Sequence, residues 1–170
     1  MARIDTDDWA PFAIGDLFDA KKGKRLTRAQ MKPGKVRFIG ASAKNNGCTA
    51  MVGNVGNIHP ANTLTVCYNG SVGAAFFQDE PYLASDDVVV LYPKFAMTRE
   101  IALFFIPLIK AAGARYDYVD KWRMEIMVMD EILLPTDNSG KPDWNHIEAY
   151  MLEIMEQANN AISELTRIWA

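Results

Sequence analysis

Residues 143–170 read DWNHIEAYMLEIMEQANNAISELTRIWA, and this run without glycine or proline decides the fold class. Asp143 is a favourable N-cap for a helix, and Arg167 near the end complements the helix dipole. Apolar residues recur at alternating intervals of four and three, which is the spacing of a coiled-coil seam. The seam comprises Ile147, Met151, Ile154, Ala158, Ala161, Leu165 and Ile168. The sequence therefore predicts a terminal helix roughly 40 Å long.

This helix could fold back onto its own domain or project from it. A rod of that length exceeds what is needed to cover one side of a small domain. A seam this regular also requires a matching seam on a second helix. We therefore favour a projecting helix that pairs with another, and the small side chains of Ala158 and Ala161 would allow close approach.

Upstream of this run, helical signals begin after Lys94. Thr98 is a favourable N-cap before an apolar stretch, and Gly113 is the expected end of that helix. The elements expected next are a polar loop at 113–121, a short helix at 122–129, a strand at 131–134 and a linker at 136–142.

The first two-thirds of the chain are predicted to form short strands and loops. Residues 63–68 are rich in β-branched side chains and end at Asn69-Gly70, a strong turn signal. Together with the apolar residues 72–77 they predict a β-hairpin. The stretch 41–62 contains three Gly and five Asn and is predicted to be structureless; such a long insert is usually functional. Other strands are expected at 35–39 and 87–92.

Composition places these elements in one domain. With 170 residues, 49% of them hydrophobic, the chain can build one substantial core. We expect an α+β fold, with a β-rich module and short helices over 1–142 and the long coiled-coil-type helix over 143–170. No signal-peptide pattern or membrane-spanning apolar run is present, so we expect a cytosolic (cytoplasmic) protein with reduced Cys48 and Cys67.

Charge is distributed unevenly along the chain. Between Ala20 and Gln78 there are nine basic residues and no acidic one, whereas residues 1–20 and 79–170 carry net charges of −4 and −8. A local basic field on a protein with a pI of 5.4 marks where a polyanion could dock. The nine basic residues are Lys21, Lys22, Lys24, Arg25, Arg28, Lys32, Lys35, Arg37 and Lys44.

Nucleic-acid binding is the function that this pattern favours. The cations could hold phosphates, while Gln30 and the polar side chains of 42–47 could reach base edges; a solvated turn is an equally good interpretation of 42–47. The loop around 113–123 interleaves aromatic and basic residues, which suits stacking and backbone contact, although it could also pack on its own core. The candidate contacts to double-stranded DNA are Lys22, Lys24, Arg25, Arg28, Ser42, Lys44, Asn45, Asn46, Tyr116, Tyr118, Lys121 and Arg123.

The sequence contains none of the common catalytic motifs. There is no phosphate-binding loop, dinucleotide fingerprint, HExxH or Gly-x-Ser-x-Gly motif. Adjacent residues of a strand point to opposite faces, so Asp86 and Asp87 are interpreted as hydrogen-bonding groups at the start of a strand. His59 is interpreted as a loop histidine, and the cysteines make no metal-ligand spacing with it. We predict no catalytic residue, metal or cofactor.

Six segments carry a resemblance to a known family. They are WAPFAIGDLF at 9–18, NGSVG at 69–73, ASDDVVVLYP at 84–93, the phenylalanine-containing helix around Phe104, LLP at 133–135, and GKPDWNHIEAYM at 140–151. In this order they resemble the target recognition domain of the DNA-specificity (S) subunit of type I restriction–modification systems. The similarity is greatest to the variety that pairs with fused endonuclease–methyltransferase subunits in type IIB systems.

The resemblance implies a non-catalytic DNA-recognition module followed by a helix. In this family two modules and two antiparallel helices usually lie in one subunit, read the halves of a split DNA target and dock methyltransferase subunits. The implied partners are double-stranded DNA and the methyltransferase and endonuclease subunits. This chain has one module and one helix, so it is either a half-length subunit that forms a homodimer through the helix or a piece of a longer protein.

The resemblance transfers no base-contacting residue, because the recognition loops vary widely within the family. The alternative function is a protein-interaction module whose working part is the helix and whose basic loops bind an acidic partner.

Overall fold

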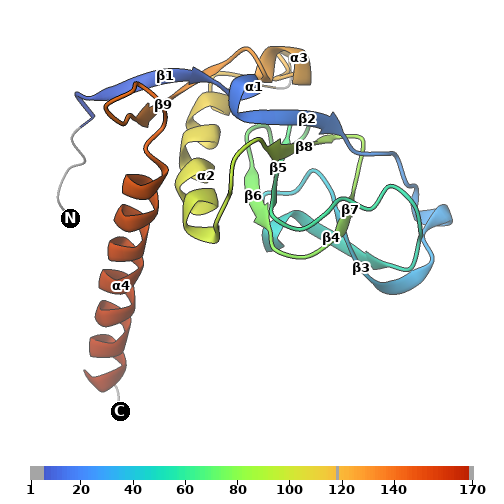
Figure 1. Ribbon diagram of the computed structural model, residues 1–170. Helices are drawn as coiled ribbons and strands as arrows, with labels where there is room; N and C mark the ends of the chain where they lie inside the picture. The colour runs from blue at the N-terminus through green and yellow to red at the C-terminus, as the bar shows by residue number, and fades with distance from the viewer. Residues whose placement is uncertain (1–5, 118, 169–170) are drawn as a thin grey trace.

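The computed structural model describes residues 6–117 and 119–168, which form a β-rich module and a long helix that leaves it (Figure 1). The predicted α+β class is confirmed. The strands are β1 (Trp9–Ala13), β2 (Phe18–Lys22), β3 (Pro33–Ile39), β4 (Cys48–Val52), β5 (Thr63–Cys67), β6 (Ala75–Gln78), β7 (Tyr82–Ala84), β8 (Val88–Pro93) and β9 (Glu131–Pro135). The helices are α1 (Ile14–Leu17), α2 (Arg99–Gly113), α3 (Met124–Met127) and α4 (Trp144–Ile168), with 3-10 turns η1 (Arg28–Gln30) and η2 (Asn45–Gly47).

A four-stranded antiparallel sheet in the order β2-β8-β5-β6 forms the centre of the module. Its inner strands β5 and β8 are buried on both faces, as a continuous apolar run such as Val88–Leu91 requires. Because side chains alternate along a strand, Val89 and Leu91 join the hydrophobic core beneath α2, whereas Val88 and Val90 join a second cluster. The sheet is therefore the middle layer of the module.

The second cluster is completed by a three-stranded sheet in the order β4-β3-β7, in which β3 pairs antiparallel with β4 and parallel with β7. Ile39 of β3 and Tyr82 of β7 are buried there against β8. Figure 1 shows this small sheet on the side of the central sheet that faces away from α2.

α2 covers the other face of the central sheet. The Thr98 hydroxyl accepts a hydrogen bond from the Ile101 N–H at 3.3 Å, which confirms the predicted N-cap. Phe105 is fully buried and packs edge-on against Phe18 with ring centres 5.2 Å apart. The antiparallel β1–β9 ribbon and α3 lie at one end of α2, at the top of Figure 1.

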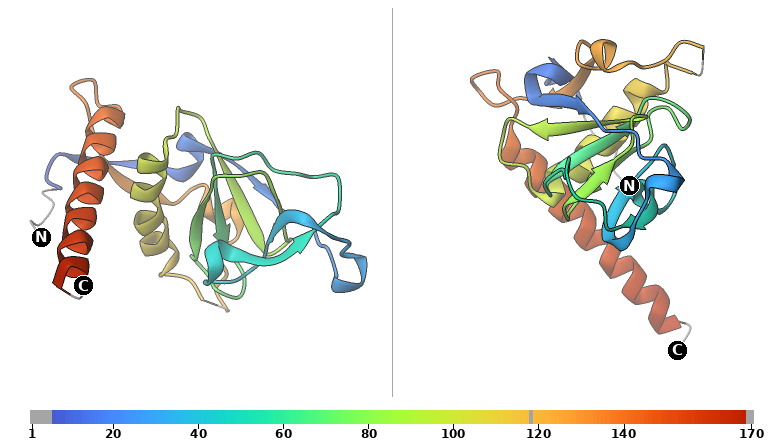
Figure 2. Two further views of the ribbon diagram at one scale, coloured as in Figure 1. Left: turned by 90° about the horizontal axis from the view of Figure 1, so that it is seen from below. Right: turned by 90° about the vertical axis from the view of Figure 1, so that its right-hand side faces the viewer.

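α4 packs on α2 along its first half. Ile147 is fully buried, and the Tyr150 ring meets Phe104 edge-on at 6.3 Å. Every described side chain from Glu156 to Arg167 is exposed, and Figure 2 shows the last turns of α4 leaving the module. The first half of α4 therefore folds back on the module and the second half projects from it, whereas pairing with another helix stays a prediction. The side chain of Ile168 lies outside the described residues.

Three elements differ most from the sequence predictions. The stretch 41–62 is not structureless, because β4 within it pairs with β3. β6 begins at Ala75 rather than at residue 72, so the hairpin closes through a longer turn, 68–74, that packs against the end of α2. α3 is shorter than 122–129, because Trp122 is buried in the core and its indole N–H donates to Asp130 Oδ2 at 2.6 Å.

Candidate nucleic-acid interface

The first basic segment runs along the corner between β7 and β8. The Gly23 N–H donates to the backbone oxygen of Val88 at 2.9 Å. The Lys24 N–H donates to the backbone oxygen of Ala84, the last residue of β7, at 2.8 Å. A Cβ at residue 23 would lie 2.2 Å from the Ser85 oxygen, so glycine is required for this close approach. Lys22 and Lys24, on either side of it, are exposed beside the corner.

Two lysines of this segment lie over tyrosine rings. Lys22 Nζ is 4.8 Å from the centre of the Tyr68 ring, and Lys21 Nζ is 5.1 Å from the centre of the Tyr92 ring. Such cation–π contacts orient an exposed ammonium group without neutralising it. Both charges therefore remain available to an anionic ligand.

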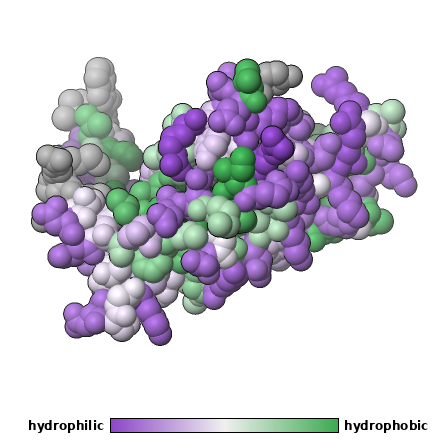
Figure 3. Space-filling view, turned by 90° about the horizontal axis from the view of Figure 1, so that it is seen from above, coloured by the Kyte–Doolittle hydropathy of each residue, from purple (hydrophilic) through white to green (hydrophobic). Residues whose placement is uncertain are grey.

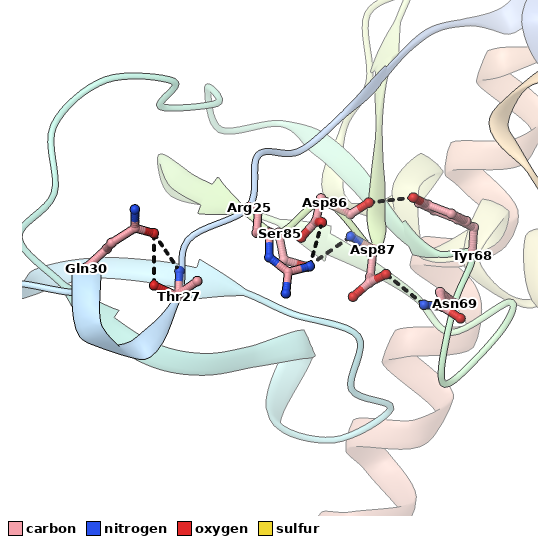
Figure 4. A network of polar contacts seen from close by, with 8 residues as sticks. All are labelled: Arg25, Thr27, Gln30, Tyr68, Asn69, Ser85, Asp86 and Asp87. Carbon is pink, nitrogen blue, oxygen red and sulfur yellow. Dashed lines mark hydrogen bonds and ion pairs between the residues drawn. The ribbon is translucent and has the colours of Figure 1, made fainter.

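Two arginines follow at the start of the loop that leads to β3. Arg25 Nη1 lies 3.5 Å from Asp86 Oδ2, and Arg28 is exposed in η1. η1 is closed by the Gln30 side chain, whose oxygen accepts from the Thr27 N–H at 3.1 Å and from the Thr27 hydroxyl at 2.9 Å (Figure 4). The loop is thus locally ordered by its own polar side chains.

The loop 40–47 contains the residues predicted to reach bases. Asn45 and Asn46 have φ values of 52° and 51°, a left-handed conformation that asparagine tolerates better than most residues. Their side-chain amides donate to the backbone oxygens of Cys48 at 3.1 Å and Phe77 at 3.0 Å. These two amides therefore stabilise the loop, which presents an exposed Lys44.

Ser42 has a local role in the same loop. Its hydroxyl accepts from the Lys44 N–H at 3.1 Å, and the Gly40 N–H donates to the Gly47 oxygen at 2.9 Å across the loop base. Whether Ser42, Asn45 and Asn46 also contact bases stays a prediction.

The second predicted loop is anchored to the module by Asp130. The Tyr116 ring stacks on Trp122 with ring centres 5.7 Å apart, and its hydroxyl donates to Asp130 at 3.2 Å. Arg115 pairs with the same carboxylate at 3.2 Å. The Tyr116 ring is therefore used in packing, and its role in stacking on bases stays a prediction.

The other candidates of this loop are placed differently. Lys121 is half-buried, and Arg123 is exposed at the N-cap position of α3. Tyr118 lies outside the described residues. A DNA contact by any of these three stays a prediction.

The turn 68–74 lies between the two loops, a relationship that sequence reasoning missed. A Cβ at Gly70 would lie 3.3 Å from the Ala41 side chain, and a Cβ at Gly73 would lie 3.2 Å from the Gly113 Cα. The Asn69-Gly70 pair was the available signal, but it indicated a hairpin turn and not its neighbours. We call residues 21–30, 40–47, 68–74 and 85–87 the basic face.

Two cations of the acid-free window form ion pairs. Arg25 pairs with Asp86, and the Arg37 side chain, only 19% exposed, lies 2.7 Å from Asp79 and 3.0 Å from Glu80. The hydrogen bond from Arg37 lowers the pKa of the Asp79 carboxyl. Among the described residues, no ion pair is formed by Lys21, Lys22, Lys24, Arg28, Lys32, Lys35 or Lys44.

His59 lies in the connection between β4 and β5, as its interpretation as a loop histidine requires, but its side chain is buried. Its ring stacks on Tyr82, and Nδ1 lies 2.5 Å from the Tyr92 hydroxyl. Burial, and then the nearby charge of Lys21, lower the pKa of His59. This histidine is held neutral in the core beneath the basic face. Within the described residues, no group of three or more His, Cys, Asp or Glu side chains could hold a metal ion.

The surface around α1 and α3 has a different character. A groove there is lined by apolar side chains, including Val128 and the 76% exposed Met129, together with the carboxylates of Asp16 and Glu125. Figure 3 looks onto the end of the molecule that carries α3 and shows hydrophobic patches between hydrophilic side chains. Such a surface does not favour a phosphate backbone.

Comparison with known proteins identifies the family. The family described as Type I restriction modification DNA specificity domain matches residues 6–164. The chain belongs to this family. It is 36% identical over 147 residues to the specificity subunit S.BcgI of a type II restriction enzyme from Heyndrickxia coagulans, a match that covers 86% of the chain and 43% of that protein.

Solved structures share the fold of this specificity domain. The S subunit of a type I restriction–modification system from M. genitalium superposes with a TM-score of 0.62 and 19% identity, over 95% of this chain and 44% of that one. The HsdS subunit from Thermoanaerobacter tengcongensis superposes with a TM-score of 0.63 and 15% identity, over 99% of this chain and 41% of that one. The specificity domain described here thus spans less than half the length of the relatives that it matches. None of its described helices is long and apolar enough to cross a bilayer.

Proposed function

We propose that this chain recognises a specific double-stranded DNA sequence as one half of a restriction–modification specificity subunit. In this role it has no catalytic activity and directs partner methyltransferase and endonuclease subunits to their target. The observation that carries the proposal is the basic face, whose unpaired lysines and Arg28 lie on a protein that is acidic elsewhere. Family membership supplies the class of partner.

The experiment measures DNA selection by the purified chain with its methyltransferase subunits. A randomised duplex library is enriched over several rounds at moderate salt, and binding of the selected sequence is compared with an unrelated duplex. Lys22→Glu combined with Lys44→Glu should abolish binding, since both are exposed on the basic face. Lys141→Glu, in the turn before α4, makes the same charge change elsewhere and should bind normally. Failure of the wild-type complex to enrich any sequence would refute the proposal.

We further propose that the second half of α4 pairs with an equivalent helix, in a homodimer or in a two-module subunit. Ile162 and Leu165 are 61% and 57% exposed, although they lie on or beside the apolar seam. Ala158 and Ala161 on the same side leave room for close packing. A matching helix would remove these side chains from water.

The test of pairing is the mass of the chain in solution. Ile162→Asp combined with Leu165→Asp should give a monomer if the chain is a homodimer. Asn160→Asp introduces one such charge on the opposite side of the helix and should leave the mass unchanged. A wild-type mass equal to that of the double variant would refute the homodimer.

A further inference from the structure

Two carboxylates occupy the basic face, where they oppose phosphate binding. Asp86 and Asp87 form the corner between β7 and β8, beside Lys22 and Lys24. Like charge repels DNA, so these carboxylates lower the affinity for any DNA backbone. Their presence indicates a task other than holding phosphates.

The corner itself is held by hydrogen bonds from the turn 68–74 and from Ser85. The Tyr68 hydroxyl donates to the backbone oxygen of Asp86 at 2.6 Å, and the Tyr68 N–H donates to the backbone oxygen of Asp87 at 3.2 Å. The Ser85 hydroxyl accepts from the Asp87 N–H at 3.3 Å (Figure 4). The backbone of both aspartates is therefore fixed before any ligand arrives.

Each carboxylate holds one side chain that can read a base. Asn69 Nδ2 donates to Asp87 Oδ1 at 2.8 Å, and Arg25 Nη1 lies 3.5 Å from Asp86 Oδ2 (Figure 4). The Arg25–Asp86 pair is largely solvent-exposed, so it contributes little to stability. Its main effect is to orient the arginine.

The contact with Asp87 leaves Asn69 with the atoms that recognise adenine. An ionised carboxylate only accepts hydrogen bonds, so the Asn69 NH₂ group, and not its oxygen, must face Asp87. The second N–H and the oxygen remain to pair with adenine N7 and the adenine N6 amino group. The orientation of the amide is thus decided by its partner.

The contact with Asp86 similarly leaves most of Arg25 available. A guanidinium has five N–H donors in a rigid fork, and this contact uses one of them. The arginine side chain is 77% exposed, so the rest of the fork can reach a groove edge. Guanine O6 and N7 are the acceptors that such a fork fits.

We infer that Asn69 and Arg25 are base-reading residues, for adenine and guanine respectively, and that Asp87 and Asp86 position them. The inference rests on the proposed DNA recognition and names its specificity determinants. The surrounding lysines supply affinity that is independent of sequence.

The experiment compares affinities for the selected target and for targets with one base pair changed. Asn69→Ala should lose between about fivefold and a hundredfold discrimination at one A·T pair, and Arg25→Lys a similar amount at one G·C pair. Asp87→Asn and Asp86→Asn should weaken discrimination at the same two pairs while raising the affinity for unrelated DNA. That combination distinguishes positioning from a merely structural role.

Matched controls are Asn138→Ala, which removes an exposed amide from the turn before α4, and Lys22→Gln, which should weaken binding to every sequence equally. The inference fails if the wild type discriminates and Asn69→Ala and Arg25→Lys lose affinity uniformly or not at all. A wild type without discrimination would instead refute the proposed function itself.

Discussion

At the residue scale, polar side chains of the interface have structural partners as well as candidate ligands. Asn46 donates to the backbone of β6, and Asn69 donates to Asp87. A side chain that is already hydrogen-bonded loses less rotamer freedom when DNA arrives, because its orientation is set in advance. Preorganised amides of this kind therefore lower the entropic cost of binding.

His59 gives a pH prediction at this scale. Its pKa is lowered in the folded protein, so it contributes stability that is fully present above its unfolded pKa of about 6.5. This stability is lost as the pH falls from about 6.5 through the folded-state value. We expect the free energy of unfolding, measured with urea, to be lower at pH 5.5 than at pH 7.5.

Replacement of this histidine tests the cause. His59→Gln should flatten the pH dependence between 5.5 and 7.5, because the titrating group is gone. His146→Gln changes an exposed histidine on α4 and should keep the wild-type slope. An unchanged slope in His59→Gln would show that other groups produce it.

At the scale of elements, one continuous helix has two different environments. The first turns of α4 bury Ile147 against the module, and Trp144 stacks on Phe95 at 4.0 Å. The later turns expose Ile162 and Leu165. The module therefore fixes where the helix starts and in which direction it leaves, while its far half remains available to another chain or domain.

Two alanine substitutions distinguish the halves of α4. Ile147→Ala should lower the free energy of unfolding by about 2–5 kcal/mol, because it opens a cavity in the core. Leu165→Ala, on the exposed half, should change it by less than about 0.5 kcal/mol in dilute protein. The measurement is urea unfolding at low protein concentration. Equal losses of unfolding free energy in the two variants would contradict the difference between the buried and the exposed half of α4.

At the scale of the whole molecule, charge is separated between surfaces. The basic face collects loops from four sections of the chain, whereas the groove at α1 and α3 carries carboxylates among apolar side chains. DNA is therefore expected to approach the basic face, and its binding should depend strongly on salt.

The salt dependence can be assigned to individual residues. The logarithm of the association constant should fall linearly with the logarithm of the salt concentration, by about 0.9 for each phosphate contacted. Lys22→Gln and Lys44→Gln should each reduce the steepness by about one, whereas Lys141→Gln should not. Titrations by fluorescence anisotropy at several salt concentrations measure the slopes, and identical slopes would exclude both lysines from phosphate contact.

Features that depend on local pattern could be predicted from the sequence alone. The Thr98 cap, the long helix after Asp143 and the buried strand at Val88–Leu91 follow from hydrogen bonding and side-chain periodicity within a few residues. The acid-free window likewise locates the basic segment in the sequence.

Which of these residues meet depends on the tertiary structure. It paired Arg37 with Asp79 and Glu80 and so removed a cation from the interface, and it brought Asn69 to Asp87 across 18 positions of sequence. It also buried one half of α4 and left the other exposed. Strand order, loop proximity and helix docking depend on contacts between distant segments, which local periodicity does not encode.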